Sequence, residues 1–204
     1  MTEQATEQTG GRKVVASITL SLDGHYGAPD NPDDMSWVMP YAVTDVARDH
    51  LSNLWEPATT ALLGRVLAEG FLSFWPTVID MEGADPRDVG FARWLVDVDK
   101  VVLSSTLDQA PWERTTIENR PTAEVVAGLK ATEGGDILVP SSPSVIKALL
   151  ADDLVDRLAM TVFPVFLGGG PRLFDDGLPP GKWTIAREAA GDHGTLALVY
   201  DRVR

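Results

Sequence analysis

The chain contains no cysteine among its 204 residues. This absence excludes a disulfide scaffold and any thiolate chemistry. Basic residues are also scarce, because 17 Lys and Arg stand against 30 Asp and Glu and leave a formal net charge of -13. Such a surface repels phosphate backbones, so nucleic acid is not an expected partner. Any anionic ligand must be held by local devices such as a helix N-terminus or a single arginine.

Long apolar runs are missing as well. No stretch approaches the roughly 20 apolar residues that a membrane-spanning helix requires, so no membrane partner is expected. Residues 1–12 are polar and acidic, and they lack the basic and apolar segments of a signal peptide. We therefore predict a disordered tail over residues 1–12, one domain over residues 13–204 and a cytoplasmic location.

Predicted strands and helices alternate over the first three quarters of the domain. The strands are expected over residues 14–20, 59–63, 100–103 and 136–139, and the helices over residues 41–55, 65–71, 121–131 and 143–150. Successive strands follow over residues 157–167, 183–190 and 195–203, whereas residues 25–37 and 74–88 are predicted as loops. This order is typical of an α/β protein with a mainly parallel sheet, helices on both faces and an antiparallel edge.

Polar residues follow several of the predicted strands. Ligands of open α/β sheets bind beyond the carboxyl ends of the strands. Gly64 allows a close approach of a ligand, and Arg65 offers a fork for a phosphate. Taken alone, the pair is more simply explained as a helix start with a solvent-facing arginine. Residues 104–106, Ser-Ser-Thr, supply hydroxyl groups for a phosphate or ribose, or else form a polar turn.

Ser141 and Ser142 precede a predicted helix, where free amide groups and the helix dipole favour an anion. The alternative is plain capping, with Ser142 as the N-cap and Pro143 at the first helical position. The glycine run 168–170 lacks the Lys-Ser/Thr of a P-loop and the spacing of a dinucleotide fingerprint. It permits a close approach of backbone and cofactor, or it serves as a sharp exit from a strand.

The loop after the first strand contains Asp23, which is a candidate proton donor for hydride transfer. The competing interpretation is a turn residue beside Gly24. His50 and His193 are interpreted as structural, and the histidines show no metal-ligand spacing, so no metal site is expected. A Gly-x-Ser-x-Gly elbow is absent, which disfavours a nucleophilic hydrolase.

Several segments, taken in order, resemble one known family. They are Ser17-Ile18-Thr19-Leu20-Ser21-Leu22-Asp23-Gly24, Leu63-Gly64-Arg65 with Glu69, Val101-Val102-Leu103-Ser104-Ser105-Thr106, Asp136-Ile137-Leu138-Val139, Leu154-Val155-Asp156-Arg157-Leu158 and Pro164-Val165-Phe166-Leu167-Gly168-Gly169-Gly170. The chain resembles the dihydrofolate-reductase-like proteins related to the C-terminal reductase domain of the bifunctional riboflavin-biosynthesis deaminase-reductase. The resemblance spans about Lys13 to Arg204.

The resemblance implies a three-layer α/β/α fold with antiparallel C-terminal edge strands, a homodimer, and NADPH lying across the strand ends. By the family pattern the cofactor-binding residues are Ala16, Gly64, Arg65, Ser104, Ser105, Thr106, Ser141, Ser142, Ser144, Val145, Gly168 and Gly169. Asp23 and Trp37 are expected to face the nicotinamide and the substrate, with Asp23 as the catalytic proton source. The implied activity is reduction of a C=N or C=O bond in a small heterocyclic substrate, such as 5-amino-6-(5-phosphoribosylamino)uracil.

Two departures from the family pattern leave alternatives open. Relatives often have Ser-Arg-Thr where this chain has Ser104-Ser105-Thr106, so a partner of the NADPH 2′-phosphate is missing and NADH is a possible cofactor. Relatives also often have glycines where this chain has residues 140–143, Pro-Ser-Ser-Pro. These changes favour the alternative of a non-catalytic small-molecule or nucleotide-binding protein on the same scaffold. The zinc deaminase domain requires cysteines that this chain lacks.

Overall fold

The computed structural model describes residues 11–32 and 34–204. Most of the predicted tail, residues 1–10, lies outside the described residues. Arg12 is described and is buried, and its guanidinium donates hydrogen bonds to the carbonyl oxygens of Gly135 (2.8 Å) and Leu129 (3.1 Å). The packed part of the chain therefore includes Arg12.

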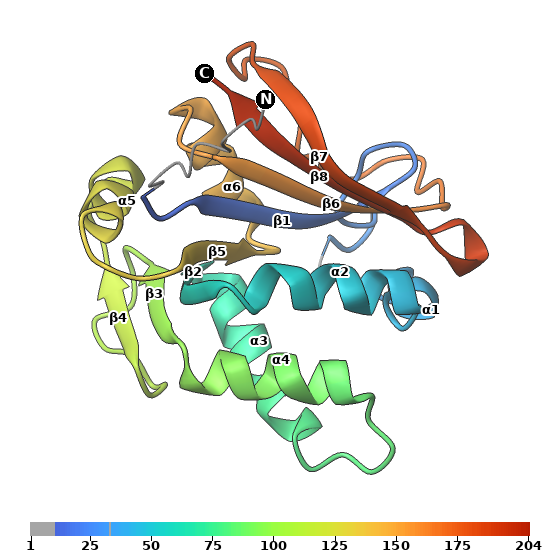
Figure 1. Cartoon of the computed structure of the whole chain (residues 1–204), viewed down its shortest axis with the longest axis horizontal. Helices are drawn as coiled ribbons and strands as arrows, with labels where there is room; N and C mark the ends of the chain where they lie inside the picture. The colour runs from blue at the N-terminus through green and yellow to red at the C-terminus, as the bar shows by residue number, and fades with distance from the viewer. Residues whose placement is uncertain (1–10, 33) are drawn as a thin grey trace, which may run out of the picture.

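The described residues form one eight-stranded sheet with the strand order β4-β3-β2-β5-β1-β6-β8-β7 (Figure 1). Its strands are β1 (Val14–Ser21), β2 (Ala58–Gly64), β3 (Asp99–Leu103), β4 (Thr115–Glu118), β5 (Asp136–Pro140), β6 (Arg157–Phe163), β7 (Lys182–Ala190) and β8 (Leu196–Val203). The strands from β4 to β6 in this order are parallel, whereas β8 is antiparallel to both β6 and β7. The predicted mixed sheet with an antiparallel C-terminal edge is confirmed.

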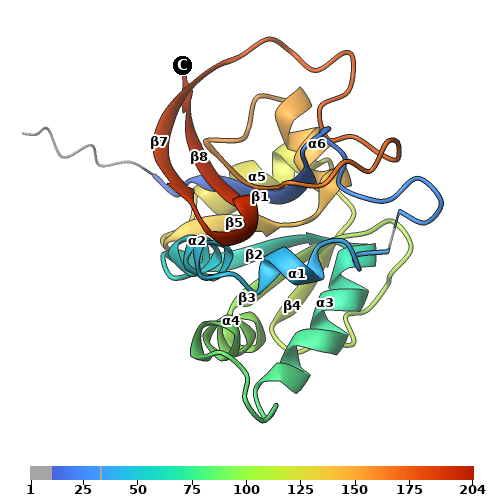
Figure 2. The ribbon, with the colours of Figure 1, turned by 90° about the vertical axis from the view of Figure 1, so that its right-hand side faces the viewer.

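Helices cover both faces of this sheet (Figure 2). One face carries α1 (Met39–Ala42), α2 (Asp45–Trp55), α3 (Arg65–Val78) and α4 (Pro86–Asp97), and the other carries α5 (Thr122–Lys130) and α6 (Pro143–Ala151). A short 3-10 turn, η1 (Asp192–Gly194), joins β7 to β8. The predicted three-layer arrangement is confirmed. Across the described part of the chain, no helix has the length and apolar character needed to cross a membrane.

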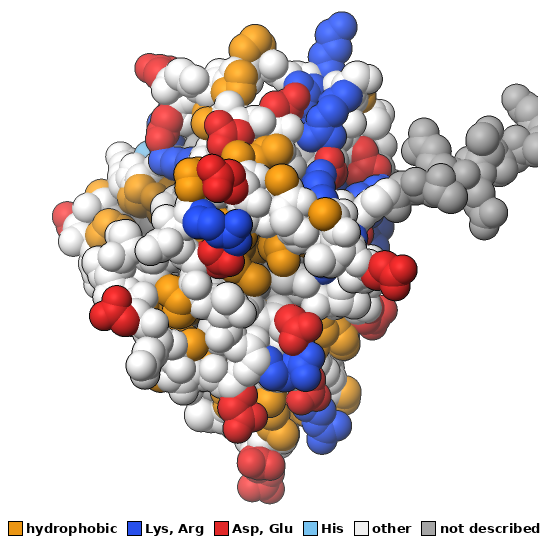
Figure 3. Space-filling model, turned by 90° about the vertical axis from the view of Figure 1, so that its left-hand side faces the viewer, with side chains coloured by type: hydrophobic (Ala, Val, Ile, Leu, Met, Phe, Trp, Pro, Cys, Tyr) orange, Lys and Arg blue, Asp and Glu red, His pale blue; other side chains and the backbone are white. Residues whose placement is uncertain are grey.

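The central strand β1 is apolar on both faces, as expected for a parallel strand between two helical layers. Val14, Ala16 and Ile18 pack in the cluster beneath α5 and α6, whereas Val15 packs with Leu54 of α2 on the opposite face. Alternate residues of β1 therefore hold both helical layers in place. Figure 3 shows one face of the molecule, on which acidic, basic and apolar side chains are interspersed.

The structure corrects the prediction of a loop over residues 74–88. Residues 74–78 complete α3, because Pro76 lies within its last two turns and interrupts little of the helical hydrogen bonding. Residues 86–88 begin α4, in which Asp85 is the N-cap and accepts a hydrogen bond from the amide of Arg87 (2.9 Å). The strand predicted over residues 157–167 ends at Phe163, since Pro164 has no amide hydrogen for pairing.

Candidate active site

A cleft of about 1210 Å³ opens at the carboxyl ends of β1, β2, β3 and β5. Its walls come from α1, α2, α3 and the start of α6. Of the predicted site residues, the structure brings Gly64, Arg65, Ser104, Ser105, Thr106, Ser141, Ser142, Ser144 and Val145 together along this cleft. Their shared location follows from the sheet, because parallel strands present their carboxyl ends at one edge. Their role in holding a cofactor stays a prediction.

The starts of α3 and α6 are tied together by one hydrogen bond. The amide of Gly64, the N-cap residue of α3, donates to the Oγ of Ser142, which is buried (3.1 Å). Ser142 is the N-cap residue of α6 but forms no side-chain capping hydrogen bond. Plain capping is therefore not what its hydroxyl does, and the first amides of α6 have no side-chain acceptor from the N-cap residue. These amides are suited to an anion.

Gly64 leaves a narrow space between the starts of α3 and α6. A Cβ atom at position 64 would stand 3.4 Å from Cγ2 of Val145 and 3.5 Å from Oγ of Ser144. A larger side chain would fill the space between the two helix starts. Ser141, next to this corner, has a φ of +40°, which lies in the left-handed region that favours glycine. The serine therefore occupies a strained backbone position.

Arg65 and the residues after β3 flank the same corner. The Arg65 guanidinium donates to both carboxylate oxygens of Glu69 at 3.0 Å, one turn along α3, and both side chains are well exposed. An exposed pair of this kind contributes little stability, so a phosphate can displace Glu69. Ser104 instead closes a turn, since its Oγ accepts from the amides of Thr106 (3.1 Å) and Leu107 (3.0 Å).

Asp23 lies outside the cleft lining and anchors a loop. Its carboxylate accepts hydrogen bonds from the Ser21 hydroxyl (2.6 Å) and from the amides of Gly168 (2.8 Å) and Leu167 (3.2 Å). Burial opposes ionisation of Asp23, but these three hydrogen bonds prevail and lower its pKa to about 2. The proton-donor role of Asp23 stays a prediction, and its ionised state at neutral pH disfavours it.

The anchoring role of Asp23 predicts a dependence of stability on pH. The pKa of Asp23 is about 2 in the folded chain, below its ordinary value of 3.8. The ionised carboxylate therefore stabilises the fold above pH 3.8, and this contribution is lost as the pH falls toward 2. We expect Asp23→Asn to lower the free energy of unfolding by about 1–2 kcal/mol at pH 7 and by much less near pH 2. Urea unfolding at a series of pH values measures both, and an equal loss at every pH would contradict the assignment.

The other predicted residues also lie off the cleft lining. Ala16 is fully buried in the sheet, and Gly168 and Gly169 belong to the turn that Asp23 anchors. Trp37 packs edge-to-face on Phe163, with ring centroids 6.2 Å apart, and Phe163 itself lines the cleft. Trp37 thus supports the cleft wall from behind. The predicted cofactor and substrate contacts of these residues stay predictions.

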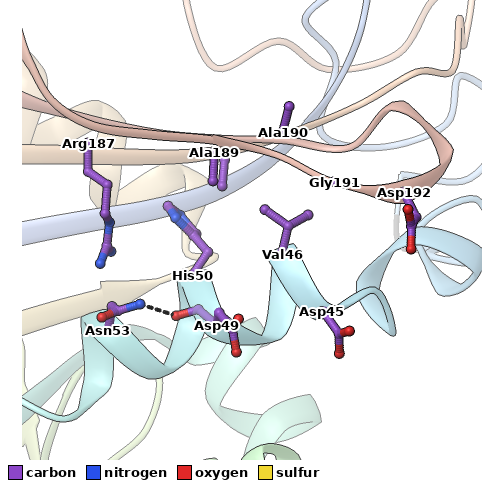
Figure 4. A pocket seen from close by; sticks show the side chains of 11 residues that line it. Asp45, Val46, Asp49, His50, Asn53, Arg187, Ala189, Ala190, Gly191 and Asp192 are labelled. Carbon is purple, nitrogen blue, oxygen red and sulfur yellow. Dashed lines mark hydrogen bonds between the residues drawn. The ribbon is translucent and has the colours of Figure 1, made fainter.

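His50 of α2 lines the cleft although the sequence interpretation assigned it a structural role. Its side chain is buried and its Nε2 has no hydrogen-bond partner among the described residues. Burial, reinforced by the charge of Arg187, lowers the pKa of His50 to about 4, so the ring is neutral at pH 7. Figure 4 shows His50 beside Arg187 in a smaller cavity between α2 and β7, of about 300 Å³. The sequence signal that could have revealed this position is the helical spacing of His50 with Ala47 and Leu54, the buried residues of α2.

Among the described residues, no cluster of histidine, aspartate or glutamate is arranged to hold a metal ion. The site therefore offers hydroxyl groups, helix N-termini and one displaceable arginine rather than metal ligands. Such groups are suited to the phosphates and ribose of a nucleotide.

Solved structures of other proteins share this architecture. A putative riboflavin biosynthesis protein from Shewanella sp. PV-4 superposes with a TM-score of 0.71 at 21% identity, covering 94% of this chain and 99% of that one. A diaminohydroxyphosphoribosylaminopyrimidine deaminase/5-amino-6-(5-phosphoribosylamino)uracil reductase from Thermotoga maritima gives 0.64 at 15% identity, covering 95% and 57%. Dihydrofolate reductase from Enterococcus faecalis, complexed with NADP(H), gives 0.58 at 15% identity, covering 94% and 97%. The dihydrofolate-reductase-like fold is confirmed.

The family itself follows from the sequence match. The model of the RibD C-terminal domain matches residues 12–196, which include every strand of the cleft edge. The resemblance read from the ordered segments is confirmed, and the chain belongs to the RibD C-terminal domain family.

Proposed function

We propose that this chain is an NADPH-dependent reductase that transfers hydride to a C=N or C=O bond of a small, heterocyclic substrate. The observation that carries the proposal is the convergence of two helix N-termini, those of α3 and α6, on a 1210 Å³ cleft at the strand ends. Membership of the RibD C-terminal domain family supports it, as does the fold shared with a dihydrofolate reductase complexed with NADP(H).

The residues of the cleft fit a dinucleotide. The uncapped amides at the start of α6 and the Ser144 hydroxyl are placed to receive the pyrophosphate, and Gly64 leaves room for it. Arg65, once released from Glu69, takes the 2′-phosphate in place of the arginine that Ser105 replaces. The bound cofactor would supply the hydride, whereas the protein supplies orientation and exclusion of water.

The proton that accompanies the hydride has no carboxylic acid as an evident source. The acidic residues that line the cleft are Glu82, Asp85 and Asp88. Asp85 and Asp88 are bound to Arg48, at 3.3 Å and 2.8 Å, and the pKa of Asp85 is lowered, chiefly by its hydrogen bonds from Arg87. Asp23 is ionised at neutral pH and lies off the cleft. Glu82, the remaining acidic residue of the lining, is exposed to solvent. In this proposal the proton comes from water.

Thermal melts with saturating NADPH, NADH or no nucleotide test the proposal. A ligand at 100 times its Kd stabilises a protein by about 2.7 kcal/mol, which corresponds to a rise in Tm of very roughly 5–10 °C for a domain of this size. We expect the larger rise with NADPH. The variant Arg65→Gln should bind the two nucleotides alike, because only NADPH carries the 2′-phosphate. The absence of a shift with either nucleotide would refute the proposal.

The competing function is a non-catalytic small-molecule or nucleotide-binding protein. Two features favour it. The resemblance leads us to expect an arginine at position 105, where this chain has serine, and Ser141 is strained at a φ of +40° beside the helix start. It predicts weak or no dinucleotide binding and no oxidation of NADPH in the presence of any pyrimidine or pterin. A homodimer and a cytoplasmic location are proposed on the resemblance alone.

A further inference from the structure

The half of the cleft away from the strand ends is walled by apolar side chains. They come from α1 and the segment after it (Met39 and Val43), from α3 (Phe71, Phe74 and Trp75) and from the following turn (Met81). Met39, Phe74 and Met81 are each at least half exposed. When an apolar ligand covers large exposed side chains in a concave site, apolar surface is removed from water on both partners, which favours binding.

The arginines that line the cleft are already paired with carboxylates. Arg48 binds Asp88 (2.8 Å) and Asp85 (3.3 Å) and donates to the Val43 carbonyl oxygen (2.8 Å), and its side chain is 18% exposed. Arg65 is the other arginine of the lining, and it stands at the cofactor corner bound to Glu69. His50 is neutral at pH 7. Among the described residues that line the cleft, no lysine or arginine is left without a carboxylate partner.

We propose that the hydride acceptor is an uncharged, apolar ring compound, and that the cleft rejects substrates that carry a phosphate or carboxylate. This inference rests on the proposed function, which assigns Arg65 to the cofactor. An anion in the apolar half would lose part of its hydration without gaining a cation, which disfavours its binding. A phosphoribosylated pyrimidine is therefore not the substrate class that this chain favours.

A pair of probes with the same shape and different charge tests the inference. The compounds are 1-phenyl-1,2-propanedione, which is uncharged, and phenylglyoxylate, in which a carboxylate replaces the acetyl group. Binding to the NADP⁺-saturated protein is followed by the quenching of tryptophan fluorescence, since Trp75 lines the cleft. We expect the diketone to bind at least 10-fold more tightly. Equal or tighter binding of phenylglyoxylate would overturn the inference.

Turnover with NADPH gives a second measurement. Each reduction moves one hydride from NADPH to the carbonyl carbon and one proton from water to the oxygen, so that a ketone becomes an alcohol and NADPH becomes NADP⁺. We expect kcat/KM for the diketone to exceed that for phenylglyoxylate by at least 10-fold. A ratio of one or below would count against the inference.

Two variants test whether the pairing of Arg48 is the cause. Asp88→Asn removes its closest carboxylate and should improve phenylglyoxylate binding about 10-fold without changing diketone binding. Phe74→Arg, at an exposed position, adds an unpaired cation and should also improve phenylglyoxylate binding. This second variant keeps the test decisive if Asp88→Asn does not fold. Asp152→Asn, an exposed aspartate away from the cleft, is the matched control and should change neither affinity. If neither Asp88→Asn nor Phe74→Arg improved the binding of phenylglyoxylate, the inference would be overturned.

The two proposals fail in different ways. If neither NADPH nor NADP⁺ raises the Tm, the proposed function is wrong, whatever the probes do. If the nucleotides bind and phenylglyoxylate binds at least as well as the diketone, the proposed function stands and the inference on substrate class is wrong.

Discussion

Replacement of Ser144 by aspartate is expected to weaken NADPH binding about 100-fold and to leave the folded protein at least as stable as before. Ser144 is exposed, lies in the first turn of α6 and lines the cleft. A carboxylate near a helix N-terminus is favourable by about 0.3–1 kcal/mol, so the fold does not suffer. The same carboxylate competes for the helix amides and repels the pyrophosphate at about 5 Å by about 3 kcal/mol.

The opposite signs of these two effects make Ser144→Asp informative. Isothermal titration with NADPH measures the affinity, and urea unfolding without nucleotide measures the stability. Ser144→Asn is the matched control, because asparagine has the shape of aspartate without the charge, and it should lose no more than about fivefold in affinity. If the aspartate variant bound NADPH as tightly as the parent chain, the pyrophosphate would not lie at the start of α6.

Replacement of Lys100 by methionine is expected to lower the free energy of unfolding by about 3 kcal/mol. Lys100 is only 3% exposed, and its ammonium group donates to the carbonyl oxygens of Leu95 (3.0 Å), Val96 (2.9 Å) and Val98 (2.8 Å). These oxygens end α4, so the variant leaves several acceptors without their donor at the helix C-terminus. Burial lowers the pKa of Lys100, yet the three carbonyl groups still hold the ammonium in place.

Urea unfolding of Lys100→Met measures this loss. Lys13→Met is the matched control, since Lys13 is exposed, and it should change stability by less than about 0.5 kcal/mol. A loss below about 1 kcal/mol at position 100 would show that water replaces the ammonium at these carbonyl groups.

The strands of the cleft edge could be predicted because each is a short apolar run followed by polar residues. Gly64, Ser104 and Ser141 come from three such runs, and the rule that parallel strands end at one edge was enough to bring them together. Local patterns carry that information, and so the fold class and the cofactor corner of the cleft were accessible from the sequence.

Features that depend on contacts across the chain were not accessible. The sequence around Asp23 is typical of a turn. Its anchoring role depends on the amides of residues 167 and 168, which come from a distant part of the chain and donate to its carboxylate. His50 reads as part of an amphipathic helix, and its neutral state follows from burial against β7. The proline signals at residues 76 and 86 were interpreted as loop punctuation, whereas one lies within α3 and the other begins α4. A proline is found both in loops and near the end of a helix, so the residue type alone does not distinguish the two.

The position of β1 in the sheet has a consequence for the time course of folding. Val14 pairs with Ile137, and Val15 pairs with Arg157, so both neighbours of the first strand are translated more than a hundred residues later. A nascent chain therefore holds an apolar strand with two open edges until residues 137–163 have been made. Such long-range parallel pairing folds slowly and leaves the chain prone to association in the meantime. Strands β2, β3 and β4 pair with one another earlier in the chain, so β1 is the strand that waits longest for its neighbours.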